Sequence, residues 1–256
     1  MLQSKSVILV HGMFVNNTSW SEWKSYLEGK GYIVYTPANP GHEGYPAELR
    51  ERIHPRLVQT GFEDVVMNIV KLIDTLPEKP IVIGHSMAGL VIQKLIQLDK
   101  AVAGISIDGA PPKNVIPPLS TVKIVWPAVN LFKGNSHYLG SRQWYRKAFF
   151  NTLSEAESNK AYDDIAVPES RKIGKDTLFK TFSNVDFKKP HAPLLFIAGE
   201  RDTIFPPTLT QKIAGKYADK NSIVDYKMFP GRSHFLCGEK GWQEIADYIL
   251  NWVNRL

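Results

Sequence analysis

Short apolar runs alternate with amphipathic segments along most of this chain, and that rhythm constrains the fold more than any other feature. The runs are rich in Val and Ile and lack the polar alternation of a half-exposed strand. Such runs are typical of parallel strands that are buried on both faces of a sheet. The predicted strands cover residues 7–10, 32–35, 81–83, 104–107, 194–198 and 223–229.

The segments between these runs carry apolar side chains at helical spacing. Residues 20–27, 62–73 and 242–253 each repeat apolar positions three or four residues apart, as one face of a helix does. Strands that alternate with helices are joined by right-handed crossovers, which place helices on both faces of a parallel sheet. The sequence therefore predicts an α/β fold with about six mostly parallel strands.

One region, residues 112–190, interrupts this rhythm because it contains no convincing buried strand. It opens with consecutive prolines and continues with helical patterns over residues 141–153 and 154–165. Aromatic side chains are mildly enriched there, which favours an apolar pocket beneath the region. We therefore expect a helical cap at 112–190, inserted into an α/β-type core formed by 1–111 and 191–256.

Composition indicates an ordinary globular protein. Hydrophobic residues make up 43% of the chain and charged residues 22%, which excludes a disordered or fibrous class. The net charge of +6 is spread without a run of five basic residues, and no nucleic-acid-binding module is recognisable. No stretch reaches the roughly 20 apolar residues of a membrane span. We therefore expect no nucleic-acid partner and no membrane-spanning segment.

The single cysteine, Cys237, cannot form an intrachain disulfide, so folding does not require an oxidising compartment. The first residues also lack the long apolar region and the small-residue cleavage site of a signal peptide. Both observations favour a cytoplasmic protein. Cys237 itself is expected to be a small buried side chain without a chemical role.

The segment from Ile81 to Leu90 carries the clearest chemical signal. An apolar strand ends at Gly84 and a helical pattern follows Ser86, so the serine lies on a sharp strand-to-helix turn. The small residues Gly84 and Ala88, two positions before and after the serine, allow the strand and the helix to approach closely. A hydroxyl on such a turn projects at the carboxyl end of the sheet, and Ser86 is therefore the predicted nucleophile. The alternative is a serine that only caps the helix.

A nucleophilic serine needs a general base and an acid that orients the base. In this strand–turn–helix architecture the acid follows the serine and the histidine comes last, and His234 is the only histidine beyond the late strands. Asp202 follows the apolar run at 194–198 and is the predicted acid. Asp108, after the run at 104–107, is the alternative position from which a carboxylate could reach the histidine.

The oxyanion that forms during acyl transfer requires backbone N–H donors. We expect one donor to be the amide of Met87, directly after Ser86, and the other to be the amide of Met13, in the loop after the first strand. Phe14 is the alternative donor and is expected to contact the substrate. His11 is expected to make a structural hydrogen bond in the same turn.

Metal or cofactor chemistry has little support in the sequence. There is no H-E-x-x-H motif, Cys/His cluster or phosphate-binding glycine-rich loop, and residues 84–89 lack the start of a dinucleotide fingerprint. We therefore predict no metal and no cofactor. Of the remaining histidines, His85 is expected to point away from Ser86, and His42 to lie in a loop near the pocket.

Four segments together resemble the α/β-hydrolase superfamily: Val-His-Gly-Met at 10–13, Gly-His-Ser-Met-Ala-Gly at 84–89, Gly-Glu-Arg-Asp at 199–202 and Gly-Arg-Ser-His at 231–234. They occur in the family's order over nearly the whole chain. The resemblance implies an α/β-hydrolase fold, a triad of the serine, histidine and aspartate named above, and no cofactor. Because there is no room for two extra strands at the start, the chain is most similar to the small esterase, methylesterase and hydroxynitrile-lyase branch.

The predicted function is hydrolysis of a small-molecule carboxylic ester or lactone with a small or medium acyl group, through an acyl-enzyme on Ser86. Two alternatives come from other classes. A hydroxynitrile lyase would use a nearby lysine, for which Lys240 is considered, and a non-enzymatic receptor would bind a small ligand in the same pocket. Thioester, amide and carbon–carbon substrates also fit these residues, and the sequence carries no prediction of the oligomeric state.

Overall fold

The computed structural model describes residues 4–256 and contains a six-stranded sheet with the strand order β2-β1-β3-β4-β7-β8. All neighbouring strands in this sheet are parallel, which confirms the predicted α/β class and strand number. Residues 1–3, the start of the segment considered above as a signal peptide, lie outside the described range. The strands are β1 (Ser6–Val10), β2 (Ile33–Tyr35), β3 (Ile81–His85), β4 (Ala103–Ile107), β7 (Leu194–Gly199) and β8 (Val224–Phe229).

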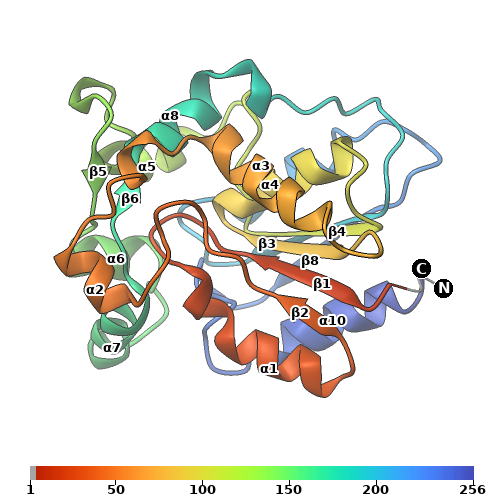
Figure 1. The fold of residues 1–256 in the computed structure, drawn as a ribbon, viewed down its shortest axis with the longest axis horizontal. Coiled ribbons are helices and arrows are strands. Elements are labelled where there is room, and N and C mark those ends of the chain that lie inside the picture. The colour runs from red at the N-terminus through yellow and green to blue at the C-terminus, as the bar shows by residue number, and fades with distance from the viewer. Residues whose placement is uncertain (1–3) are drawn as a thin grey trace.

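Helices cover both faces of this sheet (Figure 1). Along β1, Val7 and Leu9 pack on one face and Ile8 and Val10 on the other, and all four side chains are buried. Burial of each such side chain stabilises the fold by about 1.5–3 kcal/mol, which explains why the run has no polar alternation. The first face is covered by α1 (Ser21–Gly29) and α10 (Gln243–Val253), and the second by α3 (Phe62–Ile73), α4 (Met87–Gln97) and α9 (Pro207–Ala214).

The carboxyl ends of the parallel strands meet at one edge of the sheet, so the loops that follow them gather in one place. The loops after β1, β3, β7 and β8 contain Met13, Ser86, Asp202 and His234, respectively. The sheet therefore brings together predicted site residues from four distant parts of the chain.

Between β4 and β7 the chain leaves the sheet and forms a mainly helical segment at this carboxyl edge (Figure 1). Its elements are α5 (Leu119–Val129), β5 (His137–Tyr138), α6 (Arg142–Ala148), α7 (Glu155–Ile165), β6 (Glu169–Ser170) and α8 (Arg171–Phe179). The helical patterns at 141–153 and 154–165 correspond to α6 and α7. The sequence pattern does not predict α8, the β5–β6 antiparallel pair, or α5, in which Pro127 reads as a helix break.

The remaining elements are α2 (Pro46–Glu51) and single 3-10 turns at Asn17–Trp20, Leu57–Gln59, Leu131–Lys133 and Thr181–Ser183. Over residues 4–256, no helix combines the length and the apolar character that crossing a bilayer requires.

Helix α4 passes close to the end of β3 at Gly84, as the spacing of small residues predicts. A Cβ atom at Gly84 would lie 2.5 Å from the carbonyl oxygen of Ala88, well inside van der Waals contact. The neighbouring atom belongs to the backbone of α4, so it has little freedom to move away.

We expect Gly84→Ala to lower the free energy of unfolding by about 1–3 kcal/mol, because the added methyl group overpacks this contact. Gly29→Ala is the matched control: a Cβ at Gly29 meets no atom within 4 Å, and alanine there should stabilise α1 by up to about 1 kcal/mol. Urea denaturation measures both changes. If Gly84→Ala were no less stable than the control, the close approach of helix and strand would be wrong.

Candidate active site

Ser86 lies on the turn between β3 and α4, with backbone angles of φ +60° and ψ −125°. A positive φ is unfavourable for a residue with a side chain, so surrounding bonds must hold the turn. The Ser86 amide donates to the Ile107 carbonyl of β4 at 2.9 Å. The Ser86 carbonyl accepts from the amides of Gly89 and Ala110, at 2.9 and 3.0 Å. These three hydrogen bonds fix the direction in which the side chain leaves the turn.

The structure brings the predicted serine, histidine and aspartate into one chain of hydrogen bonds. Nε2 of His234 lies 2.9 Å from the Ser86 hydroxyl oxygen, and Nδ1 of His234 lies 2.7 Å from Oδ2 of Asp202. Oδ1 of Asp202 accepts the amides of Ile204 at 2.7 Å and Phe205 at 3.0 Å. Burial raises the pKa of Asp202 well above its usual range, but these two amides and the adjoining Asp108 carboxyl act in the opposite direction. Asp202 is therefore the member of this carboxyl pair that carries the negative charge, and it can hold the tautomer in which Nδ1 of His234 carries the proton.

His234 is fully buried, and burial lowers the pKa of its imidazole to about 3. The ring is therefore neutral at pH 7. With Nδ1 protonated toward Asp202, Nε2 is free to accept the hydrogen of the Ser86 hydroxyl. The Asp202 carboxylate would stabilise the imidazolium that forms when this proton is transferred.

Asp108, the alternative acid, is fully buried at the end of β4 and bonds to a different partner. Its Oδ1 accepts the amide of Gly199 at 2.8 Å, and its Oδ2 has no hydrogen-bond partner in the described part of the chain. Burial, together with the adjoining Asp202 carboxylate, raises the pKa of Asp108 well above its usual range. Asp108 is thus favoured in its uncharged form, and it is Asp202 that hydrogen-bonds the imidazole of His234.

His85 holds the loop that carries His234, a contact that the sequence analysis does not predict. Nε2 of His85 donates to the His234 carbonyl oxygen at 2.7 Å, and the centroids of the two rings are 4.8 Å apart. Burial, and to a smaller extent the nearby His234, lowers the pKa of His85 to about 3, so this ring is also neutral. The end of β3 therefore positions both the serine and the loop of the imidazole. Adjacency to Ser86 is the one sequence signal for this role.

The loop after β1 lies directly against the serine. A Cβ atom at Gly12 would lie 2.8 Å from the serine Cβ, so glycine is required for this approach. The Phe14 amide donates to Oε2 of Glu169 at 3.3 Å, which occupies the alternative oxyanion donor. The amides of Met13 and Met87 have no acceptor among residues 4–256. Both are therefore available to an oxyanion at the serine.

A buried ion pair supports this loop from the helical segment. Glu169 lies on β6, with Oε2 3.3 Å from Nε2 of His42, and both side chains are at most 1% exposed. Burial is the largest single effect and alone would lower the pKa of His42. The Glu169 carboxylate, with smaller contributions from Glu43 and the Pro168 backbone, outweighs burial, and the pKa is raised. The same carboxylate oxygen accepts the Phe14 amide. The pair therefore ties β6 to the loop after β1, and no local motif in the sequence marks it.

His11 makes the structural hydrogen bonds expected of it. Its Nδ1 lies 2.8 Å from the Gly12 carbonyl oxygen, and its Nε2 accepts the Asn39 amide at 3.0 Å. Burial, and to a smaller extent the neighbouring His42, lowers the pKa of His11 to about 3, so the ring stays neutral. His42 lies beside it with ring centroids 5.3 Å apart, in a loop next to the site as expected.

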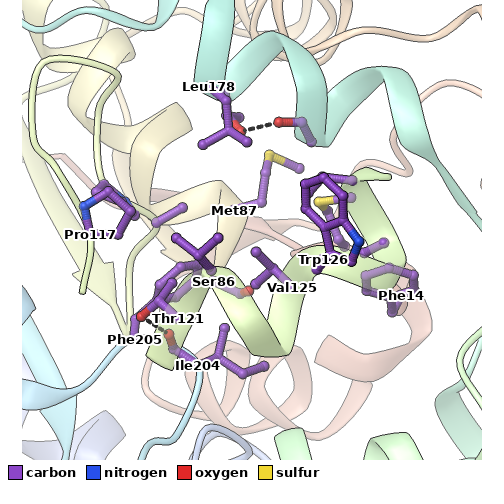
Figure 2. Close-up of a pocket in the computed structure, with 18 of the residues that line it drawn as sticks. Phe14, Ser86, Met87, Pro117, Thr121, Val125, Trp126, Leu178, Ile204 and Phe205 are labelled. Atoms are coloured by element: carbon purple, nitrogen blue, oxygen red, sulfur yellow. Dashed lines mark hydrogen bonds between the residues drawn. The ribbon is translucent and has the colours of Figure 1, made fainter. Parts of the chain in front are cut away.

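A cavity of about 250 Å³ opens beside Ser86, close to the lower end of the range for small-molecule pockets. Figure 2 shows side chains of α5 on one side of it and Leu178 of α8 on the other. The wall's two threonines, Thr121 and Thr177, donate their hydroxyls to main-chain carbonyls, so Ser86 carries the one hydroxyl of the lining that is bonded to a base. The wall is otherwise apolar and includes Phe14, Met87, Val125, Trp126, Leu178 and Phe205.

Among residues 4–256, one group of side chains could offer three ligand atoms to a metal. Candidate ligand atoms of His85, Asp108 and His234 lie within 4.8 Å of one another. Hydrogen bonds already occupy Nε2 of His85 and both ring nitrogens of His234. The absence of a metal or cofactor stays a prediction.

Known protein families and solved structures provide an independent comparison for the fold. The family model described as the alpha/beta hydrolase family matches residues 7–248, nearly the whole chain. The chain belongs to the alpha/beta hydrolase family. None of the curated proteins is similar enough in sequence to match.

This alpha/beta hydrolase resembles solved structures over almost its full length. A methylesterase from Arabidopsis has a TM-score of 0.71 at 13% identity, with 98% of this chain and 99% of that chain covered. A monoacylglycerol lipase from Paleococcus ferrophilus has a TM-score of 0.71 at 21% identity, with 96% of this chain and 93% of that chain covered. An extracellular α/β-hydrolase from a Paenibacillus species has a TM-score of 0.72 at 21% identity, with 96% of this chain and 98% of that chain covered. At these identities the likeness concerns the fold, and it confirms the predicted α/β-hydrolase architecture.

We predict that Glu169→Gln lowers the pKa of His42 below 6.5, because burial then acts without the opposing carboxylate. In the unmodified protein the raised pKa means that the pair stabilises the fold most fully below pH 6.5. That contribution is lost as the pH rises through the pKa of folded His42. The shifts of the histidine ring protons in NMR spectra, recorded as the pH is varied, measure the change.

The control for this experiment is Glu155→Gln, which removes the carboxylate of an exposed pair with Arg146. It should leave the titration of His42 unchanged. A pKa of His42 that stays above 6.5 in Glu169→Gln would contradict the role of the ion pair.

Proposed function

We propose that this alpha/beta hydrolase is a serine hydrolase of carboxylic esters, with Ser86 as nucleophile, His234 as general base and Asp202 as the acid that orients the base. The observation that carries the proposal is the unbroken chain of hydrogen bonds from Asp202 through His234 to a serine beside an apolar cavity. Nucleophilic catalysis needs such an activated hydroxyl next to a space in which the reacting carbon can lie.

The proposed reaction begins when Nε2 of His234 removes the proton of the Ser86 hydroxyl and Oγ attacks the ester carbonyl carbon. The amides of Met13 and Met87 bind the negative oxygen of the tetrahedral intermediate. The bond to the alcohol oxygen then breaks, and the imidazolium gives its proton to the departing alcohol. Water that loses a proton to His234 attacks the acyl-enzyme, which releases the carboxylic acid and restores Ser86.

The cavity supports an uncharged substrate with a small or medium apolar group. Among the described residues, those that line it include no Asp, Glu, Lys or Arg, so a charged group would be buried there without a partner. A simple ester and a lactone both meet this requirement. We propose that residues 112–190 cap the core of 1–111 and 191–256, and that Phe14 contacts the substrate. No metal or cofactor takes part in the proposed reaction.

The lyase alternative needs a cation at the cavity, and no Lys or Arg from 4 to 256 lines it. Lys240, the lysine considered for it, lines a separate surface pocket together with Arg232 and Glu244. No specific observation favours the receptor alternative, which requires ligand binding without turnover. We place the enzyme in the cytoplasm, for which the single free cysteine, Cys237, is the support.

We expect Ser86→Ala and His234→Ala to lower kcat for p-nitrophenyl butyrate by at least about 10⁴-fold, because each breaks the proton-transfer chain. Asp202→Asn should cost about 10⁴-fold, since it favours the wrong tautomer of His234. Asp108→Asn is the matched control, because an uncharged carboxyl is replaced by an uncharged amide, and kcat should change by less than about tenfold. The rate of p-nitrophenolate release measures all four.

Turnover that survives in Ser86→Ala would mean that another residue is the nucleophile. Equal losses in the two aspartate variants would contradict the assignment of the acid. Cyanide release from mandelonitrile by a protein without ester turnover would favour the lyase. Tight ester binding without turnover would favour the receptor.

A further inference from the structure

The mouth of the cavity is surrounded by exposed apolar side chains. Thirteen large apolar side chains are exposed in the described part of the chain, and seven of them belong to one stretch around α5 and the end of α8. We call six of these residues the apolar rim: Ile116, Leu119, Trp126, Leu131, Phe132 and Phe179. The seventh, Val122, is 37% exposed and lines the cavity.

The rim is continuous with the cavity beside Ser86. Trp126, Leu131 and Phe179 line the cavity while remaining partly exposed, and Figure 2 shows Trp126 at its edge. The other three residues extend the apolar surface outward and do not line the cavity: they are 81% (Ile116), 68% (Leu119) and 88% (Phe132) exposed. An apolar surface that begins at a pocket and spreads beyond it marks a contact site rather than scattered exposure.

Helix α5 carries the centre of this surface. Leu119 and Trp126 lie seven residues apart, which places them on the same side of the helix. Thr121 and Ala128 are buried on the opposite side, against the body of the protein. A helix with apolar residues on both its inner and outer sides has no purely aqueous outer surface, so it fits a partner that is itself apolar.

The charges in the stretch that carries five of the six rim residues are of one sign. The stretch of residues 109–154 contains six Lys and Arg residues and no Asp or Glu. Lys123 lies within α5, Lys133 follows Phe132, and Lys180 follows Phe179. These three lysines are exposed and form no salt bridge with any residue from 4 to 256. The rim therefore combines exposed aromatic and aliphatic groups with free positive charges.

We propose that the apolar rim docks the protein on the surface of an anionic lipid bilayer, so that ester substrate enters the cavity directly from the lipid. Aromatic and aliphatic side chains flanked by lysines are the composition that binds at the boundary between headgroups and acyl chains. Lys123, Lys133 and Lys180 would lie against anionic headgroups. The docking surface is a physical property of the rim, while the entry of substrate rests on the proposed ester hydrolysis.

A second copy of this chain fits the rim less well than a bilayer does. In a two-fold symmetric dimer the same patch meets itself, so the rims of both copies would face each other. The lysines of the two copies would then be brought together without carboxylates from 109–154 to neutralise them. Like charges that meet in an interface disfavour it.

The test is co-sedimentation of the protein with vesicles of phosphatidylcholine and phosphatidylglycerol in equal parts, compared with vesicles of phosphatidylcholine alone. The double variant Ile116→Ser and Phe132→Ser should bind the anionic vesicles at least about tenfold more weakly. The double variant Lys123→Gln and Lys133→Gln should lose about tenfold on anionic vesicles and little on neutral ones. Ile33→Ser, at a side chain 57% exposed outside the rim, is the control and should bind like the unmodified protein.

The variants also separate docking from catalysis. Turnover of soluble p-nitrophenyl butyrate should be unchanged in all of them, because none of the altered residues lines the cavity. If the protein hydrolyses this ester but binds neither kind of vesicle, the docking proposal is wrong and the proposed ester hydrolysis still holds. A protein that binds anionic vesicles through the rim but hydrolyses no ester supports the docking and overturns the proposed function. A dimer in sedimentation velocity that the Ile116 and Phe132 substitutions dissociate would mean that a second copy covers the rim, and the proposal would be wrong.

Discussion

The site depends on the strained turn at Ser86, which is held between two strands and a helix. Its amide bonds to β4, and its carbonyl bonds to the first turn of α4 and to the loop after β4. Gly12 and Gly84 lie so close to this turn and to α4 that a Cβ at either would clash. The turn, the loop after β1 and the helix therefore fit together in one arrangement, which sets the direction of the hydroxyl and leaves two amides beside it.

Around this turn the fold buries several ionisable side chains and satisfies most of them with hydrogen bonds. Buried polar groups are costly when unpaired, so the bonds that satisfy them also specify the geometry. His85 at the end of β3 holds the loop of His234, and Glu169 on β6 holds the loop of Met13 through the Phe14 amide. The helical segment thus supports the loop that carries the Met13 amide, the proposed oxyanion donor, although the segment lies outside the sheet.

The core could be predicted from the sequence because strands buried on both faces are apolar throughout, and every strand of the sheet begins and ends within two residues of its predicted bounds. The order of serine, acid and histidine along the chain also predicted that these side chains meet, since the carboxyl ends of parallel strands lie at one edge of the sheet. The choice of Asp202 over Asp108 depends on which loop reaches Nδ1, and a pattern does not contain that distance. Helix α5 is not predicted because Pro127, which lies within it, is read from the sequence as a helix break. The pair of His42 and Glu169 joins distant segments that no local periodicity connects.

The most direct test of the central claim is the residue to which an alkyl fluorophosphonate attaches. Such a compound reacts with a serine that is activated by a neighbouring base and leaves ordinary surface serines unmodified. Intact-mass spectrometry should show one adduct per chain, peptide mapping should place it on Ser86, and His234→Ala should strongly slow its formation. A folded protein that stays unlabelled, or an adduct on a residue other than Ser86, would contradict the account.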